Sequence, residues 1–469
     1  MIRVFDHYVP TRTVLELSVD FMLLLLAAIA SGVTLAAFSG APVHPGDLVA
    51  SLLPEALSFS LVMLVLFAAF GAYQRDRVGS LRAMLLCMLL ATFVSVGPLF
   101  FLVLQLTDTE RHPLHFLGLA YVYQFLALVL IRRPLMSAHR RGLWNRKVLV
   151  IGCGAEAQSV AADIEQRGGG AYDLVGFYPS RDDDAPAPGL SAPVLDTART
   201  LAALAGEHDI DDIVVAVREQ RGGVLPLRHL LECRTLGIAV HSLAAFSERL
   251  KGEVPLDSLK ASWLIYGNGF AQGWLRTTIK RLFDVVVALT LLALTWWIML
   301  LAALAIFIED GAPVLFRQER VGRSGKTFHV LKFRSMRTDA EKDGVARWAQ
   351  ANDSRVTRVG RFVRKTRIDE LPQLFNVLRG EMSLVGPRPE RPSFVEQLTE
   401  QIPFYAIRHS VKPGLTGWAQ VRFSYGASLA DARRKLQFDL YYVKNHSLVL
   451  DAQILLETVR VVVFGEGAR

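Results

Sequence analysis

Two adjacent carboxylates mark the stretch of this sequence whose residue types are best suited to chemistry. Asp369 and Glu370 follow a run of cations and precede a Gly-Pro-Arg-Pro turn, in which Arg388 is held between two prolines. Carboxylates can supply a nucleophile and a metal ligand, and a rigidly presented arginine holds phosphate oxygens in bidentate fashion. This mixture is typical of a site for a nucleotide diphosphate. The cations that precede the pair are Arg361, Arg364, Lys365 and Arg367.

The two carboxylates are expected to have different tasks. Consecutive residues of a helix point about 100° apart, so one side chain would reach the reacting phosphorus while the other turns to a metal or a supporting partner. A second interpretation makes Asp369 the N-cap of a helix over Glu370–Leu378, with Pro372 in its first turn. The two interpretations are compatible, because a carboxylate at a helix N-terminus stays ionised and the free N–H groups there favour a phosphate.

Other cations are predicted to bind the substrates. Lys332 and Arg334 are two residues apart at the end of an expected strand over Phe328–Phe333, and side chains with this spacing share one face of a strand. Arg408 and Lys412 come shortly before a Pro-Gly turn. They would complete a pocket for anions.

The composition indicates a membrane protein with phosphorylated partners and no nucleic acid. The 469 residues are 52% hydrophobic and have a mean hydropathy of +0.31, which is high for a soluble protein. The net charge of +8 favours anionic lipid and phosphate, because the basic residues cluster beside apolar segments and resemble no nucleic-acid-binding module. Cys87, Cys153 and Cys233 show neither metal-binding nor disulfide spacing.

Four apolar segments form the first predicted domain, residues 1–135. Each is near the roughly 20 residues that cross a bilayer. Lys and Arg gather in the N-terminal arm, in the second loop and after the fourth segment, so both ends of this bundle are predicted to be cytoplasmic. The segments are Leu15–Phe38, Ala56–Tyr73, Ala83–Leu106 and Leu114–Ile131.

A Rossmann-like α/β domain is predicted for residues 146–243. A strand leads into Gly-x-Gly-x-x-Ala at residues 152–157 and then a helix, which fits the first turn of a βαβ unit. The second strand ends in Phe-Tyr-Pro at 177–179 and lacks the acidic residue that would bind a ribose, so a scaffold is favoured and dinucleotide binding stays an alternative. Residues 244–273, of mixed charge, are interpreted as a linker. The expected strands are Arg146–Val150, Tyr172–Phe177 and Asp212–Val217.

Several motifs in one register resemble the bacterial sugar transferases, which are polyprenyl-phosphate hexose-1-phosphate transferases. The stretch TRIDELPQLFNVLRGEMSLVGPRP at 366–389 carries the clearest likeness, and the resemblance covers roughly Arg276 to Thr458. It implies that residues 274–469 form the catalytic domain. Large members of the family also have four membrane helices and a Rossmann-like domain, and the opening MIRVFDHYVP is similar to members tied to exopolysaccharide export. The other matching segments are Lys280–Asp284, Phe316–Met336, Val411–Val421 and Leu436–Thr458.

The resemblance also implies a reaction. A hexose 1-phosphate would move from a UDP-sugar to polyprenyl (undecaprenyl) phosphate with release of UMP, which initiates exopolysaccharide or another lipid-linked glycan. Asp369 would attack the β-phosphorus to give a phosphosugar-aspartyl intermediate, with Glu370 as the second catalytic carboxylate. Mg²⁺ held by this pair would neutralise phosphoryl charge. The expected place is the bacterial inner membrane, with several passes and the catalytic domain in the cytoplasm, and a homo-oligomer is left open.

A fifth apolar run, Val285–Ile308, is long enough to cross the bilayer, since 24 residues span about 36 Å. Cations crowd both of its ends, however, which favours a helix that enters the membrane and returns to the same side. The family breaks this helix at a Ser-Pro pair, whereas this sequence has no proline there, so we expect the turn near Thr295 and the adjacent Trp296 and Trp297. The predicted fold class is thus a membrane α-helical bundle, an α/β Rossmann-like domain and an α+β monotopic catalytic domain with a re-entrant helix.

Two other functions were weighed. A membrane-bound nucleotide-sugar dehydratase or epimerase would need a Tyr-x-x-x-Lys pair, and no tyrosine in this sequence has a lysine four residues on. A non-catalytic membrane scaffold or nucleotide sensor would leave the Asp-Glu pair and the Gly-Pro-Arg-Pro turn without a role. The sequence does not determine the hexose or the preferred length of the lipid.

Overall fold

The computed structural model describes residues 2–464, apart from short gaps. An N-terminal helical unit includes most of residues 8–146, and a second unit includes most of residues 147–469. The residues outside the description are 1, 5–6, 10, 40–44, 71, 74–80, 107–112, 133–144, 169–171, 181–189, 197–198, 218–224, 257–272, 339–354, 424–427 and 465–469.

The N-terminal unit consists of long apolar helices, as the four hydrophobic segments predict. Three of them are long and apolar enough to cross a membrane, and the fourth has a shorter apolar stretch at Leu85–Phe100. Five of the arginines that predict the orientation lie outside the described residues, namely Arg75, Arg77, Arg133, Arg140 and Arg141. The helices are α1 (Thr11–Ser39), α2 (Pro45–Ala69), α4 (Leu81–Leu106) and α5 (Pro113–Ala127), which continues as a π-helical turn at Leu128–Arg132, and two short strands, β1 (Ile2–Val4) and β2 (His7–Val9), precede them.

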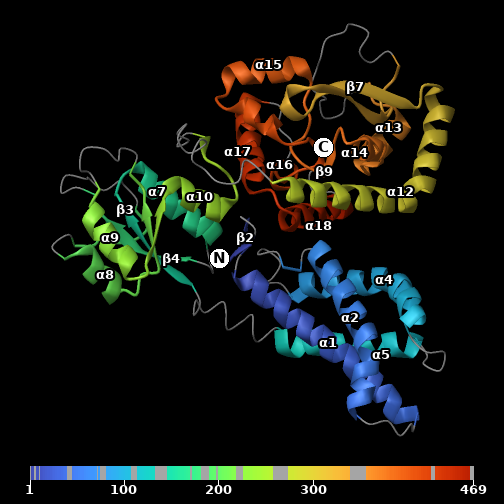
Figure 1. Ribbon diagram of the computed structural model, residues 1–469, viewed down its shortest axis with the longest axis horizontal. Helices are drawn as coiled ribbons and strands as arrows, with labels where there is room; N and C mark the ends of the chain where they lie inside the picture. Colours follow the sequence, from blue (N-terminus) through green and yellow to red (C-terminus); the bar gives the residue numbers. More distant parts are fainter. Residues whose placement is uncertain are drawn as a thin grey trace. The chain divides into compact units, whose positions relative to one another are not determined.

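The predicted α/β domain is confirmed. Its four-stranded sheet has the order β4-β3-β5-β6, in which β5 pairs in parallel with both β3 and β6. Helices α8 and α9 lie on one side of the sheet, and α7 and α10 lie on the other (Figure 1). The strands are β3 (Arg146–Ile151), β4 (Tyr172–Tyr178), β5 (Asp212–Val215) and β6 (Ala239–Ser242); the helices are α7 (Ala155–Asp163), α8 (Leu201–Glu207), α9 (Leu227–Thr235) and α10 (Leu243–Lys251).

The first glycine of the Gly-x-Gly-x-x-Ala turn has a structural task. Gly152 has φ +107°, and a Cβ atom there would lie 2.9 Å from the carbonyl oxygen of Ala216. The turn therefore needs glycine so that the chain can pass close to the neighbouring strand. This requirement exists with or without a bound ligand, and dinucleotide binding stays an alternative.

The interpretation of 244–273 as a linker is wrong for its first part. Residues Leu243–Lys251 form α10, which the Ser242 side chain caps and which ends at the left-handed Gly252. Val254 and Leu256 then insert into the core of the catalytic domain. The mixed charge of this stretch predicts a linker, whereas its first part forms a helix and buries apolar side chains.

The catalytic domain combines a long helix, two small sheets and a group of shorter helices. Strands β7 and β8 form an antiparallel hairpin, and β9 pairs in parallel with β10. The helices are α12 (Trp274–Asp310), α13 (Arg358–Lys365), α14 (Gln373–Arg379), α15 (Pro392–Gln401), α16 (Trp418–Arg422), α17 (Leu429–Asn445) and α18 (Leu448–Phe464); the strands are β7 (Leu315–Val321), β8 (Thr327–Phe333), β9 (Ser383–Val385) and β10 (Gly414–Thr416); the 3₁₀ turns are η4 (Arg323–Gly325), η5 (Ile368–Glu370) and η6 (Tyr405–Ser410).

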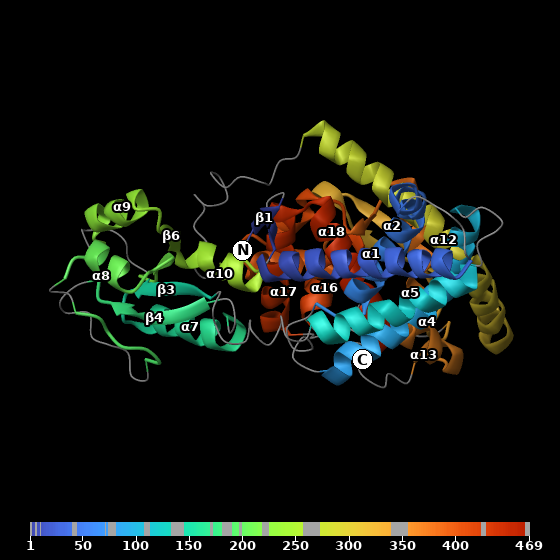
Figure 2. The ribbon, with the colours of Figure 1, turned by 90° about the horizontal axis from the view of Figure 1, so that it is seen from below.

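The expected apolar helix over Val285–Ile308 is present within α12, which is continuous over 37 residues. Figures 1 and 2 show it as two stretches that run in different directions. Thr295 donates its hydroxyl to the carbonyl of Leu291 at 2.7 Å, the type of bond that bends helices. The first stretch packs on the main core through Ala288, and the second packs through Ile306 on a separate cluster of the same domain.

Candidate active site

The local backbone separates the carboxylate pair from the helix that was expected to contain it. Arg367, in the left-handed region at φ 60°, redirects the chain after α13, and Asp369 and Glu370 lie in the 3₁₀ turn η5. Helix α14 begins only at Gln373, with Pro372 as its N-cap residue. The predicted N-cap role of Asp369 is therefore wrong. Proline fixes its own backbone for a helix start, and the helix begins directly after it.

Glu370 is the anchor of the pair. Its Oε1 lies 3.3 Å from Lys332 Nζ, 3.1 Å from Arg388 Nη2 and 4.0 Å from Arg367 Nη1. Burial alone would raise the pKa of Glu370, but the surrounding cations outweigh it and hold this pKa well below its usual range, with Arg388 contributing most and Lys332 next. Glu370 is thus ionised throughout the physiological range and gathers three cations around the site.

Asp369 has the opposite electrostatics. Burial and the neighbouring negative charge of Glu370 raise the pKa of Asp369 to about 6, against the opposing effect of nearby cations. Its Oδ1 is buried and has no hydrogen-bond partner in the described part of the chain. An ionised carboxylate with an unsatisfied oxygen is suited to attack an electrophile, because it gives up no protein hydrogen bond when it does so.

Lys332 is brought to this pair by β8, and a buried amide fixes that strand. Asn376 of α14 accepts a hydrogen bond from the backbone N–H of Leu331 at 3.0 Å and donates to the carbonyl of His329 at 2.8 Å. Asn376 was missed in the sequence. The signal in the sequence is an asparagine within an otherwise apolar helical stretch. An amide buried there, as Asn376 is, must find partners outside its own helix.

Arg388 reaches the pair from a turn that is packed backbone against backbone. The N–H of Gly386 donates to the carbonyl of Thr416 at 2.9 Å, and that of Gly414 donates to the carbonyl of Pro387 at 3.0 Å. A Cβ atom on Gly386 would lie 2.8 Å from the backbone nitrogen of Gly414, so no larger residue fits. The predicted rigidity of this arginine thus has two sources, the flanking prolines and the glycine contact.

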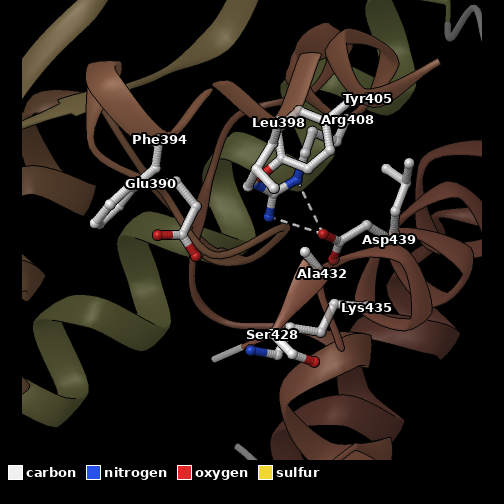
Figure 3. A pocket seen from close by; sticks show the side chains of 10 residues that line it. Glu390, Phe394, Leu398, Tyr405, Arg408, Ser428, Ala432, Lys435 and Asp439 are labelled. Carbon is white, nitrogen blue, oxygen red and sulfur yellow. Dashed lines mark hydrogen bonds and ion pairs between the residues drawn. The ribbon is translucent and has the colours of Figure 1, made fainter. Parts of the chain in front are cut away.

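The side chain of Arg408 also holds this turn in place. It is only 5% exposed, and its guanidinium donates to Asp439 at 2.8 and 3.0 Å. The same group donates to the backbone carbonyl of Arg388 at 2.9 Å. Figure 3 shows Arg408 directed at Asp439 beside a cavity of about 40 Å³ that Glu390 also lines. The substrate contact predicted for Arg408 stays a prediction, while the observed contacts position Arg388.

Arg334 and Lys412 have other surroundings. Arg334 follows the last residue of β8 and donates to the carbonyls of Asp310 at 2.7 Å and Gly311 at 2.8 Å, so it fastens the end of α12. Lys412 is half-buried beside Arg281. Of the five cations predicted to bind substrates, the structure brings Lys332 and Arg388 to the carboxylate pair. Substrate binding by the remaining three stays a prediction.

The donor set fits one kind of metal. Among the described residues, no group of three or more His, Cys, Asp or Glu side chains could hold an ion. Mg²⁺, however, is commonly bound by one or two carboxylates, with water and substrate phosphates as the other ligands. Asp369 and Glu370 suit such an ion because the Oδ1 of Asp369 is buried and unsatisfied.

Two family models match this chain. A family model described as bacterial sugar transferase matches residues 275–465, which include the whole candidate site. A second model, described as CoA-binding domain, matches residues 68–225 and includes the sheet from β3 to β5.

Three curated relatives illustrate the likeness. The UDP-N-acetylgalactosamine-undecaprenyl-phosphate N-acetylgalactosaminephosphotransferase of Aeromonas hydrophila is 45% identical over 242 residues, 52% of this chain and 56% of the relative. The undecaprenyl-phosphate glucose phosphotransferase of Komagataeibacter xylinus is 35% identical over 329 residues, 69% and 60% of the two chains. The UDP-galactose-lipid carrier transferase of Erwinia amylovora is 33% identical over 350 residues, 70% and 71%. The chain therefore spans 56% to 71% of the length of these relatives.

Proposed function

Because the chain belongs to the bacterial sugar transferase family, we propose that it transfers a hexose 1-phosphate from a UDP-sugar to polyprenyl phosphate and releases UMP. The observation that carries this proposal is that the two adjacent carboxylates have pKa values shifted in opposite directions. Glu370 stays ionised and gathers cations, whereas Asp369 has a raised pKa and an unsatisfied buried oxygen. A dehydratase or a nucleotide sensor would have no use for this arrangement.

In the first half-reaction, an oxygen of Asp369 forms a bond to the β-phosphorus of the UDP-sugar. The bond from that phosphorus to the bridging oxygen breaks, and UMP leaves with the electron pair. The product is a phosphosugar ester of Asp369. Support comes from the raised pKa of about 6, which leaves the carboxylate mostly ionised near neutral pH while keeping it a better nucleophile than an ordinary aspartate.

In the second half-reaction, a phosphate oxygen of the lipid forms a bond to the same phosphorus. The ester bond to Asp369 breaks and the carboxylate is restored, so the product is a polyprenyl diphosphosugar. Lys332 and Arg388 both contact Oε1 of Glu370 and would stabilise the negative charge that spreads over the phosphoryl oxygens in both steps. Mg²⁺ held by Asp369 and Glu370 would supply further neutralisation of the diphosphate.

We place the domain at the cytoplasmic face of the inner membrane, with α12 entering and leaving on one side. Both ends of α12 are fastened to the same catalytic domain, which supports this path. Near its start, Arg281 donates to the carbonyls of Val377 and Leu378, and at its end Arg334 binds the carbonyls of Asp310 and Gly311. A helix that crossed the bilayer would carry one of these ends away from its partners.

Single cysteines test the path of α12. Cysteines introduced at Thr277 and Gly311 should both resist a membrane-impermeant thiol reagent in intact cells, and both should react in inverted vesicles. The cysteine-free background is made first, because Cys87, Cys153 and Cys233 are present. Labelling of position 311 from outside the cell would contradict the re-entrant path.

The activity is tested with the purified full chain in detergent. The chain is mixed with a panel of UDP-sugars, with and without polyprenyl phosphate, and UMP is measured. We expect multiple turnovers only when both substrates are present. A folded chain that releases no UMP from any of the sugars would overturn the proposal, and NAD-dependent conversion of the free UDP-sugar would favour a dehydratase.

A further inference from the structure

A second group of cations lies apart from the carboxylate pair, and we define it as the basal cation cluster of Arg281, Arg323 and Lys412. These residues come from α12, from the hairpin turn η4 and from the loop before β10. A Cβ atom added to Gly380 would lie 3.5 Å from both Arg281 Nη2 and Lys412 Nζ. The two cationic groups thus lie close to the same glycine.

The charge of this cluster is unbalanced. In the part of the chain that the structure describes, the ammonium of Lys412 has no hydrogen-bond acceptor and no ion-pair partner. The carboxylate of Asp284 is near, but Lys280 at 2.6 Å and the hydroxyl of Ser383 at 2.8 Å occupy it. Burial lowers the pKa of Lys412, and the charges of Arg281 and Arg323 lower it further. Cations held together without an anion create a binding site for one.

The cluster lies at the base of the apolar helix. The first turns of α12 expose large apolar side chains, with Trp274 79% exposed and Leu282 64% exposed, next to Arg281 in the sequence. Exposed tryptophan and leucine beside arginine and lysine are typical of the level of lipid headgroups. An anion that reaches this cluster is therefore best supplied by the membrane.

The side chain of Arg281 and the carboxylate pair lie at opposite ends of α14. Arg281 binds the last carbonyls of α14, whereas Asp369 and Glu370 precede the first residue of that helix. A seven-residue helix is about 10 Å long. The positive charges that lower the pKa of Asp369 belong to Lys332, Arg367 and Arg364, which are not members of the cluster. The cluster is therefore distinct from the cations that surround the carboxylate pair.

We propose that the basal cation cluster binds the phosphodiester headgroup of an anionic membrane phospholipid. Lys412 and Arg323 supply the free positive charge, while Arg281 joins the site to α14. The bound lipid holds the start of α12 at the membrane surface, so it positions the domain without taking part in the reaction. This role differs from the substrate contact predicted for Lys412 from the sequence.

The test uses the delipidated full chain in neutral detergent, with phosphatidylglycerol as the probe and the rise in Tm as the readout. We expect the double variant Lys412→Gln, Arg323→Gln to bind phosphatidylglycerol about 30-fold more weakly than the wild type. Lys326→Gln, which removes an exposed cation from the same hairpin, is the matched control and should bind normally. Lys412→Arg should bind phosphatidylglycerol about as tightly as the wild type, because it keeps the positive charge at this position.

Three outcomes would overturn the proposal. The double variant could bind phosphatidylglycerol as tightly as the wild type, which would leave the cluster without a lipid. Inorganic phosphate could raise Tm as much as the lipid does, which would make the site a general anion site. Finally, polyprenyl phosphate could bind through Lys412 and Arg323 while phosphatidylglycerol does not, which would assign the cluster to the acceptor substrate.

Discussion

Two pairs of carboxylates in the catalytic domain have opposite surroundings. Asp284 and Asp451 share the ammonium of Lys280, at 2.6 and 3.1 Å, and their other oxygens accept hydrogen bonds from Ser383 and Tyr442. Asp369 and Glu370 are also surrounded by cations, yet the Oδ1 of Asp369 is left unsatisfied among the described residues. The first pair is arranged for stability, and the second retains a reactive group at a cost in stability.

This difference shows that one domain uses aspartate in two ways, in one place for stability and in the other for reactivity. Lys280 and Asp284 are four residues apart on α12, and Asp451 comes from α18, so the first pair joins a membrane-associated helix to the core. These two carboxylates share a single ammonium, and their burial is tolerated because each of their oxygens has a partner. In the second pair, Glu370 takes the nearby cations for itself, and the pKa of Asp369 rises because its neighbour is negative.

Asp369→Asn should have the largest effect. Turnover should fall about 10⁴-fold, as expected when a covalent nucleophile is removed. The Tm should stay the same or rise, because the substitution removes a buried charge that lies beside another negative charge. UMP release and thermal unfolding measure the two effects. A variant that keeps a tenth of the wild-type turnover would show that Asp369 is not the nucleophile.

The same substitution in the satisfied pair should act on stability. Asp284→Asn keeps an oxygen that can accept a hydrogen bond from Ser383, but it removes the 2.6 Å ion pair with Lys280, which retains Asp451 as its other partner. A hydrogen bond to a charged group contributes about 1.5–3 kcal/mol, and we expect a loss of this size. Chemical denaturation should show this loss, while UMP release per folded molecule stays close to that of the wild type. If Asp284→Asn and Asp369→Asn were equally stable, the proposed difference between the two carboxylate pairs would be wrong.

A truncation tests where the packed core of the catalytic domain begins. A chain starting at residue 242 retains Val254 and Leu256 and the carbonyl of Gly252, to which Trp418 Nε1 donates at 2.7 Å. A chain starting at Gly273 lacks all three and should be less stable by about 3 kcal/mol, since each fully buried aliphatic side chain contributes about 1.5–3 kcal/mol. Both chains contain the carboxylate pair and should release UMP when folded. Denaturation curves of the two chains in one detergent provide the comparison, and equal midpoints would contradict it.

Glu370→Gln should shift the pH dependence. Asp369 attacks only when ionised, so kcat/KM should be lost as the pH falls through about 6 and should be constant above that value. The variant removes the neighbouring negative charge, which lowers the pKa of Asp369 and moves this loss to a lower pH. The maximum rate falls as well, because Lys332 and Arg388 lose their anchor. An unchanged midpoint would show that Glu370 does not control the protonation of Asp369.

Residue types and spacing were sufficient to predict the elements and half of the site. The pairing of Asp369 and Glu370 with cations follows from their neighbours in the sequence, and the hairpin that brings Lys332 was predicted as a strand. Strands β3, β4 and β5 of the α/β domain were also found, because their apolar patterns are local.

The contacts that settle the remaining cations are not local and could not be predicted in this way. The partner of Arg408 is Asp439, 31 residues away, and Arg334 binds carbonyls that precede it by more than 20 residues. The start of α14 depended on the left-handed backbone of Arg367, a conformation that an arginine adopts only when tertiary packing requires it. Sequence patterns carry no signal for such pairings.

The most direct test of the account is to trap the intermediate. Full-length protein is incubated with a UDP-sugar that carries a labelled β-phosphate, without polyprenyl phosphate, and is then denatured and analysed by peptide mass spectrometry. We predict a phosphosugar on Asp369, close to one per active chain, which disappears when polyprenyl phosphate is added and never forms in Asp369→Asn. Full turnover with no label on Asp369 at any time would contradict the assignment of this carboxylate as the nucleophile.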